Sequence, residues 1–171
     1  MNTNERIKIF KSLMGQAFSK EEVDYFVAIF RRMGYFTAPA STKYHGNYEG
    51  GLFDHSLEVT KSLLHLTKHL KLHWNSKKSP YVVGMFHDLC KCDNYTHNGD
   101  GTYSYNPNVT IPGHAEKSLV LLVANEIGVT EEEKACIRWH MGAFDDKRKT
   151  GTSTERLLRN SLTSCGLTRQ I

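Results

Sequence analysis

Amphipathic helices with marked starting points account for most of this chain. Two capping-box patterns, in which Ser or Thr precedes Glu by three positions, mark helix starts at Ser19 and Thr130. The first pattern predicts a helix over residues 20–33, and the second predicts one that reaches residue 140. A stripe of Leu and Val at helical spacing predicts a further helix over residues 52–70, with the stripe facing inward.

Three further helices are expected from weaker signals. Ser79 and Pro80 form a favourable N-cap and first-turn pair for a helix that ends near Cys90. Apolar residues at helical spacing predict the other two, over residues 4–17 and 114–127.

One segment breaks the helical pattern. Residues 95–105 alternate around an Asn-Gly-Asp-Gly turn, which predicts a small β-hairpin. The chain of 171 residues is long enough for a single domain with a substantial core. We therefore expect an all-α helical bundle over residues 1–146 with a hairpin insertion, followed by a basic Ser/Thr-rich segment over residues 147–171 that forms an altered last helix.

Charge and hydropathy argue against duplex nucleic acid and membranes as partners of this chain. The net charge is +4, but residues 147–171 hold six basic residues and one acidic residue, so the rest of the chain is close to neutral. We therefore expect no duplex nucleic acid as a partner. The sequence contains no apolar run of the roughly 20 residues that a membrane span needs and no N-terminal signal core. The expected location is the cytoplasm, without membrane attachment.

Four histidines and one aspartate form the candidate metal site. An adjacent His-Asp pair ends an apolar run, and three more histidines could bind metal together with it. The five residues are His55, His87, Asp88, His114 and His140. Neutral imidazole and carboxylate suit zinc, iron, manganese, nickel or cobalt. Because a carboxylate has two oxygens, Asp88 could bridge two divalent ions about 3.5 to 4 Å apart, with His55 and His87 on one ion and His114 and His140 on the other. A water bound there would be a strong nucleophile near neutral pH.

Several other side chains are candidates for substrate binding. Lys91 follows Asp88 by three positions, so its ammonium could hold a phosphate oxygen as negative charge develops. Lys43 and Tyr44 lie in a loop that could line the substrate pocket, and Tyr95 lies in the hairpin, which could cover a base. Ordinary loop packing, and a hairpin that simply caps the bundle, remain the alternatives.

The motifs jointly resemble those of the HD superfamily of metal-dependent phosphohydrolases, over residues 50–146. The matching strings are Gly50-Gly51-Leu52-Phe53-Asp54-His55-Ser56, Phe86-His87-Asp88-Leu89-Cys90-Lys91, Gly113-His114-Ala115-Glu116 and Arg138-Trp139-His140-Met141-Gly142. The resemblance implies an all-helical fold and hydrolysis of a phosphomonoester or phosphodiester, with a nucleotide as the expected small-molecule partner. It also implies that the four histidines and Asp88 bind one or two ions, with Lys91 beside the phosphate.

The chain departs from the family pattern at its end. HD proteins normally place a further aspartate on a late helix, whereas no aspartate follows Asp146. We therefore expect a truncated or altered last helix, which leaves the activity of the chain open. Two other functions remain open as well: a di-iron oxygenase of the myo-inositol oxygenase type, and a non-catalytic metal-binding module.

Structural roles are the alternative for each candidate ligand. His87 and Asp88 could cap a helix end, and His55 could be a buried, hydrogen-bonded core residue. His114 and His140 could interact with helix ends through the helix dipole. The substrate, the natural metal and the oligomeric state do not follow from the sequence.

Overall fold

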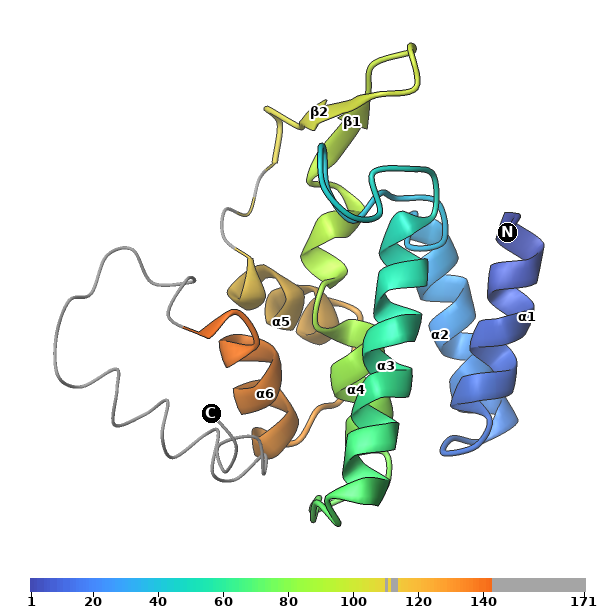
Figure 1. Ribbon diagram of the computed structural model, residues 1–171, viewed down its shortest axis with the longest axis vertical. Coiled ribbons are helices and arrows are strands. Elements are labelled where there is room, and N and C mark those ends of the chain that lie inside the picture. Colours follow the sequence, from blue (N-terminus) through green and yellow to red (C-terminus); the bar gives the residue numbers. More distant parts are fainter. Residues whose placement is uncertain (110, 112–113, 143–171) are drawn as a thin grey trace, which may run out of the picture.

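The structure, a computed structural model, describes residues 1–109, 111 and 114–142. Within this part the chain forms helices and one two-stranded antiparallel sheet, which confirms the predicted all-α class with a small hairpin (Figure 1). The elements are α1 (Thr3–Met14), α2 (Lys20–Arg32), α3 (Gly51–His69), α4 (Ser79–Phe86), the 3₁₀-helix η1 (Leu89–Cys92), β1 (Tyr95–His97), β2 (Tyr103–Tyr105), α5 (Ala115–Ala124) and α6 (Glu131–Trp139).

The helices are arranged around a central pair, α3 and α4 (Figure 1). Helices α1 and α2 pack against each other on one side of this pair, while α5 and α6 pack against each other on the other side. Helix α6 also contacts α4, and α5 contacts η1. The hairpin projects beyond the bundle, with Tyr95 opposite Tyr105.

Capping boxes start three of the helices. The predicted boxes at Ser19 and Thr130 are both formed, with each hydroxyl accepting a bond from the N–H of the Glu three residues later. Asn2 forms a third box with Glu5 at the start of α1. Asn2 followed by Glu5 could have been recognised as a capping box from the sequence, since Asn is a favoured N-cap residue.

Aromatic side chains form the core on the α1–α2 side of the central pair. Phe30 is fully buried and packs edge-to-face against Phe10 of α1 and Phe86 of α4, with ring centroids 5.8 and 5.0 Å apart. Phe26 packs against Phe86 in the same way at 5.5 Å. Such pairs add about 0.5–1.5 kcal/mol beyond the burial of their area. The core therefore fixes the end of α4, the point where the His-Asp pair begins.

The first turn of α3 is held by a buried arginine. Gly50 adopts a left-handed conformation with φ of 80°, and a side chain at Gly51 would lie 2.0 Å from a carbonyl oxygen of the preceding loop. Arg6 is only 3% exposed and donates two hydrogen bonds to the Asp54 carboxylate, at 3.1 and 3.2 Å. This bidentate pair fixes the turn of α3 that carries His55.

The inward stripe predicted for α3 is only partly correct. Leu52 and Leu63 are buried, but Leu66 is 38% exposed and Leu70, which follows the helix, is 48% exposed. The exposure follows from the difference in helix length. Helix α3 has 19 residues and is about 28 Å long, whereas α4 has eight residues and is about 12 Å long. The short partner cannot cover the last turns of the long helix.

The expected N-cap of α4 is also wrong. Ser79 is the first residue inside the helix, after Lys78, and its side chain does not cap the helix. Its hydroxyl instead donates to the Glu133 carboxylate of α6 at 2.8 Å. Because both side chains are buried, the bond to a charged acceptor outweighs a local cap, and it ties α4 to α6.

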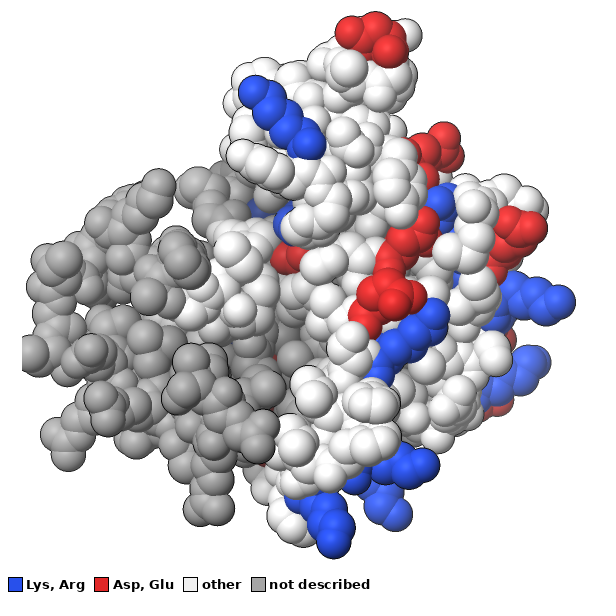
Figure 2. Space-filling model, viewed as in Figure 1, with Lys and Arg blue, Asp and Glu red and all other residues white. Residues whose placement is uncertain are grey.

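The surface of the described part carries charges of both signs. Figure 2 shows Lys and Arg interspersed with Asp and Glu on one face of the molecule. No helix among the described residues is both long and apolar enough to cross a membrane. The predicted basic segment over residues 147–171 lies outside the described residues.

Candidate metal centre

The backbone changes conformation at the His-Asp pair. Helix α4 ends at Phe86, His87 caps it, and Asp88 has φ of −109° and ψ of 20° before η1 begins. The helix that was expected to end near Cys90 thus ends at Phe86, and the 3₁₀-helix η1 follows it. Adjacent residues on an α-helix point about 100° apart, so the break lets the two side chains converge on one centre. Such bridge-region conformations are frequent at functional residues.

Lys91 returns to the same side of the chain as Asp88. Its Nζ lies 2.8 Å from Oδ2 of Asp88. The 3₁₀ geometry of η1 explains the contact, because residues three apart are eclipsed in that helix. Both side chains are shielded from solvent, with Lys91 13% and Asp88 2% exposed.

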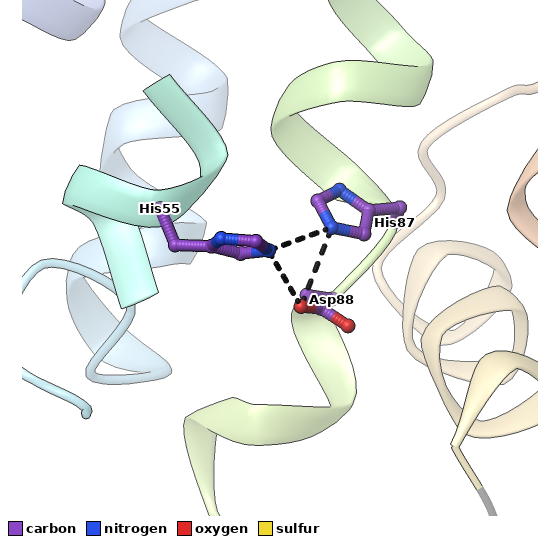
Figure 3. Close-up of side chains that lie close together, drawn as sticks. All are labelled: His55, His87 and Asp88. Carbon is purple, nitrogen blue, oxygen red and sulfur yellow. Dashed lines mark hydrogen bonds and ion pairs between the residues drawn. The ribbon is translucent and has the colours of Figure 1, made fainter. Parts of the chain in front are cut away.

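The first ligand group joins α3 to the end of α4. Nε2 of His55 and Nε2 of His87 each lie 3.3 Å from Oδ2 of Asp88. The two nitrogens are also 3.3 Å apart, so the three atoms form an equilateral triangle (Figure 3). The three atoms are close enough to bind one metal ion together.

The second ligand group uses the other carboxylate oxygen. Nε2 of His114 and Nε2 of His140 lie 3.1 and 3.4 Å from Oδ1 of Asp88, and 3.3 Å from each other. His114 immediately precedes α5, and His140 immediately follows α6. The structure thus brings together all five residues predicted as ligands, in two groups of three that share Asp88.

Backbone carbonyls orient two of the imidazoles. Nδ1 of His87 lies 2.9 Å from the carbonyl oxygen of Gly84, and Nδ1 of His140 lies 2.7 Å from that of Ile137. A carbonyl oxygen only accepts, so each Nδ1 donates its proton, and in the neutral ring Nε2 then presents a lone pair to the centre. This support is typical of metal-binding histidines.

A buried thiol supports the third imidazole. Sγ of Cys90 lies 2.9 Å from Nδ1 of His114, and the Cys90 N–H donates to the Ser118 hydroxyl. Burial raises the pKa of the Cys90 thiol to about 12, so the thiol stays protonated. From the sequence, the Cys-Lys-Cys string of residues 90–92 is weak evidence for a metal site, and a core or helix-end role for Cys90 is favoured. Its position two residues after Asp88 could have indicated that Cys90 lies next to the ligands.

The electrostatics of Asp88 favour a bound cation. Burial alone raises the pKa of Asp88, but the surrounding imidazoles, that of His87 above all, favour the charged carboxylate and hold the pKa well below its usual range. The carboxylate is therefore ionised, yet its Oδ1 makes no hydrogen bond of good geometry with any described residue. The arrangement therefore needs positive charge between the carboxylate and the imidazole nitrogens, and either protons on the nitrogens or a bound metal ion supplies it.

The spacing of the donor atoms fits transition metals. Nitrogen and oxygen ligands about 2.0–2.1 Å from a tetrahedral zinc lie about 3.3–3.4 Å from one another. The observed separations are 3.1–3.4 Å in both groups. Imidazole and carboxylate are also the donors that such ions prefer. Both groups are therefore suited to a divalent ion.

A cavity of about 630 Å³ opens onto this centre. All five candidate ligands line it, together with Lys91 and Tyr95. Of the ligands, His87 and Asp88 are buried, whereas His55, His114 and His140 are partly exposed. The volume is within the range of small-molecule sites. Most of the other lining side chains are apolar: Ala40, Val59, Leu63, Trp74, Val83, Ala135, Cys136, Trp139 and Met141.

Two predicted substrate residues lie away from this cavity. Lys43 and Tyr44 are exposed and do not line it, and Tyr44 is 77% exposed. The Ser41 hydroxyl accepts from the Tyr44 N–H and donates to the His45 carbonyl, each at 2.9 Å, which folds the loop back on itself. His45 of this loop lines the cavity instead, with its ring 5.2 Å from that of His55.

The fold and the site together define a helical protein with a His/Asp cluster that can hold metal ions. No protein-family profile and no solved structure matches the chain. Part of the chain is similar to dihydroneopterin 2',3'-cyclic phosphate phosphodiesterase from Methanocaldococcus jannaschii, with 35% identity over 71 residues. The match covers 40% of this chain and 28% of that enzyme. The chain therefore matches a little over a quarter of the length of this relative, which is named for its action on a cyclic phosphate.

Proposed function

We propose that this chain is an HD-type metal-dependent phosphohydrolase that cleaves a phosphomonoester or phosphodiester, with a nucleotide as the expected substrate. The observation that carries the proposal is the pair of ligand groups joined through the two oxygens of Asp88. The partial likeness to a phosphodiesterase supports the same reaction class. The catalytic domain is taken as residues 1–146, with residues 147–171 as a separate segment.

The ligands divide into two sets in this proposal. His55 and His87 with Oδ2 of Asp88 would hold one divalent ion, and His114 and His140 with Oδ1 would hold the second. Bound ions would supply an activated water as nucleophile and would neutralise charge on the phosphoryl group. The carbonyl contacts of His87 and His140 occupy their Nδ1 atoms and fix the rings with Nε2 aimed at the centre.

Two further side chains would act on the substrate. Lys91 lines the cavity beside Asp88, where its ammonium can bind a phosphoryl oxygen as negative charge increases in the transition state. Tyr95 lines the same cavity. Burial, and to a smaller extent the nearby Tyr105, raise the pKa of its phenol to about 12. Its hydroxyl therefore stays protonated and can donate to the substrate. The ammonium group of Lys91 favours a phosphorylated substrate over the uncharged substrate of an oxygenase.

The test combines metal content with turnover on the full chain. Protein purified without chelators should contain about two equivalents of a transition metal and hydrolyse 4-nitrophenyl phosphate or bis(4-nitrophenyl) phosphate. Asp88→Asn should lose both ions and reduce turnover by at least about a hundredfold, because the shared ligand is weakened for both sites. Asp24→Asn is the matched control, since Asp24 is exposed and pairs with Lys11 on the α1–α2 side.

Two results would overturn the proposal. One is full turnover in Asp88→Asn. The other is a metal-loaded protein that consumes oxygen but hydrolyses neither ester, which would assign the centre to a di-iron oxygenase.

A further inference from the structure

We infer that the substrate carries one phosphate on a flat, uncharged ring system, and that this ring lies in an apolar arm of the cavity between α3 and α6. The inference rests on the proposed function, because it places the phosphate at the metal centre. It adds the chemical class of the group that the phosphate is attached to.

The arm begins at the metal centre and follows α3. His55, Val59 and Leu63 all line the cavity and are spaced four residues apart, so they lie on one face of the helix. From His55 to Leu63 the helix rises about 12 Å. Ala135 and Trp139, which are four residues apart on α6, line the cavity as well. The arm is therefore long enough for an organic group next to the phosphate.

An indole provides a rigid wall for this arm. Trp74 lines the cavity and packs with Leu63 and Val83. Its Nε1–H donates to the Thr67 hydroxyl at 2.9 Å, which fixes the ring and uses its polar group. An indole held in this way offers an apolar aromatic surface, and flat rings pack favourably on such surfaces.

The distribution of charge argues against additional phosphates. Among the described residues that line the cavity, Lys91 is the one Lys or Arg, and it already pairs with Asp88. Ser41, His45 and Tyr95, the uncharged polar lining residues outside the ligand set, belong to the loop before α3 and to β1. Burying a charged group among Val59, Leu63 and Trp74 would carry a large desolvation cost. A single phosphate with an uncharged ring avoids that cost.

Binding of phosphonates tests the inference independently of turnover, because phosphonates are not hydrolysed. In calorimetry on the metal-loaded full chain, 2-naphthylmethylphosphonate should bind at least about tenfold more tightly than methylphosphonate, since its ring buries apolar surface. A sulfonate on the naphthalene should remove this gain. Ala135→Leu should also remove it by filling the arm, without weakening methylphosphonate. Ala124→Leu is the matched control, because Ala124 is exposed on α5.

The outcomes separate this inference from the proposed function. Equal affinities for the two phosphonates, or a naphthyl preference that Ala135→Leu leaves intact, would overturn the ring assignment even if the protein hydrolyses phosphoesters. A naphthyl preference that Ala135→Leu removes would support the ring assignment even if the nitrophenyl esters are not turned over.

Discussion

At the scale of single residues, the centre depends on how Asp88 divides its contacts. One oxygen faces His55 and His87, while the other faces His114 and His140. Lys91 approaches the oxygen of the first group. The lysine therefore lies beside the ligands without belonging to either group, which separates its expected role from theirs.

Lys91→Gln should reduce turnover without loss of metal. We expect kcat to fall by about 10²–10³-fold, because a fixed positive charge beside the phosphoryl group is removed. The metal content should stay at the wild-type value, since the donor atoms are unchanged. Steady-state kinetics together with elemental analysis would check both points. Lys61→Gln is the control, because Lys61 is exposed and also pairs with a carboxylate, that of Glu58. Loss of metal in Lys91→Gln would instead assign the lysine a structural role.

The residue scale is also where the sequence was most informative. The types and order of His55, His87, Asp88 and the two later histidines predict a shared centre, because ligand chemistry is a property of the side chain itself. Substrate contacts in the loop before α3 were not predictable in the same way. There the Ser41 hydrogen bonds decide which side chains face the cavity, and local polarity does not reveal them.

At the scale of elements, the crossing of α3 and α4 sets the geometry of the first ligand group. A Cβ at Gly84 would lie 2.4 Å from Oγ1 and 2.6 Å from Cα of Thr60, so the two helices approach closely enough to require glycine. The Gly84 carbonyl also accepts from His87. Helix spacing and ligand orientation are therefore coupled at one position.

Gly84→Ala should separate the two helices and weaken the first metal site. Overpacking costs about 1–3 kcal/mol and helix propensity offsets about 0.5–1 kcal/mol of it, so we expect the free energy of unfolding to fall by about 1 kcal/mol. Affinity for one of the two ions should fall more than for the other, because His55 and His87 lie across the crossing. Urea unfolding and metal titration would measure these effects. Gly128→Ala, at a position with open space around it, should change stability by less than about 0.5 kcal/mol. Unchanged stability and metal affinity in Gly84→Ala would contradict the coupling.

Element types were more predictable than their ends. Capping boxes fix the starts of α2 and α6, because the bonding groups are three residues apart in the sequence. The end of α4 and the burial of α3 depend on partners distant in sequence. Ser79 bonds to Glu133 of α6, and Leu66 remains exposed because α4 is too short to reach it.

At the scale of the whole molecule, the metal centre connects the two halves of the bundle in addition to their shared apolar core. The α1–α2 side is joined to α4 by buried aromatic rings around Phe30. On the other side, α5 and α6 place His114 and His140 against Asp88, so ligand atoms meet where positive charge is needed between them. We therefore expect the stability of the fold to depend on metal.

Metal removal should lower the thermal midpoint of unfolding. An ion that binds the native state alone stabilises it by about 2.7 kcal/mol at a concentration 100 times its Kd. For a chain of this size each kcal/mol corresponds to about 2–4 °C, so a chelator should lower Tm by roughly 5–10 °C. Calorimetry with and without chelator would show the shift, and readdition of the metal should reverse it. Asp88→Asn should show little response to chelator, because its ions are already lost. An equal Tm in both conditions for the wild type would mean that the ligand groups are held in place by the surrounding protein alone, and that the ion contributes nothing to joining α5 and α6 to the central helices.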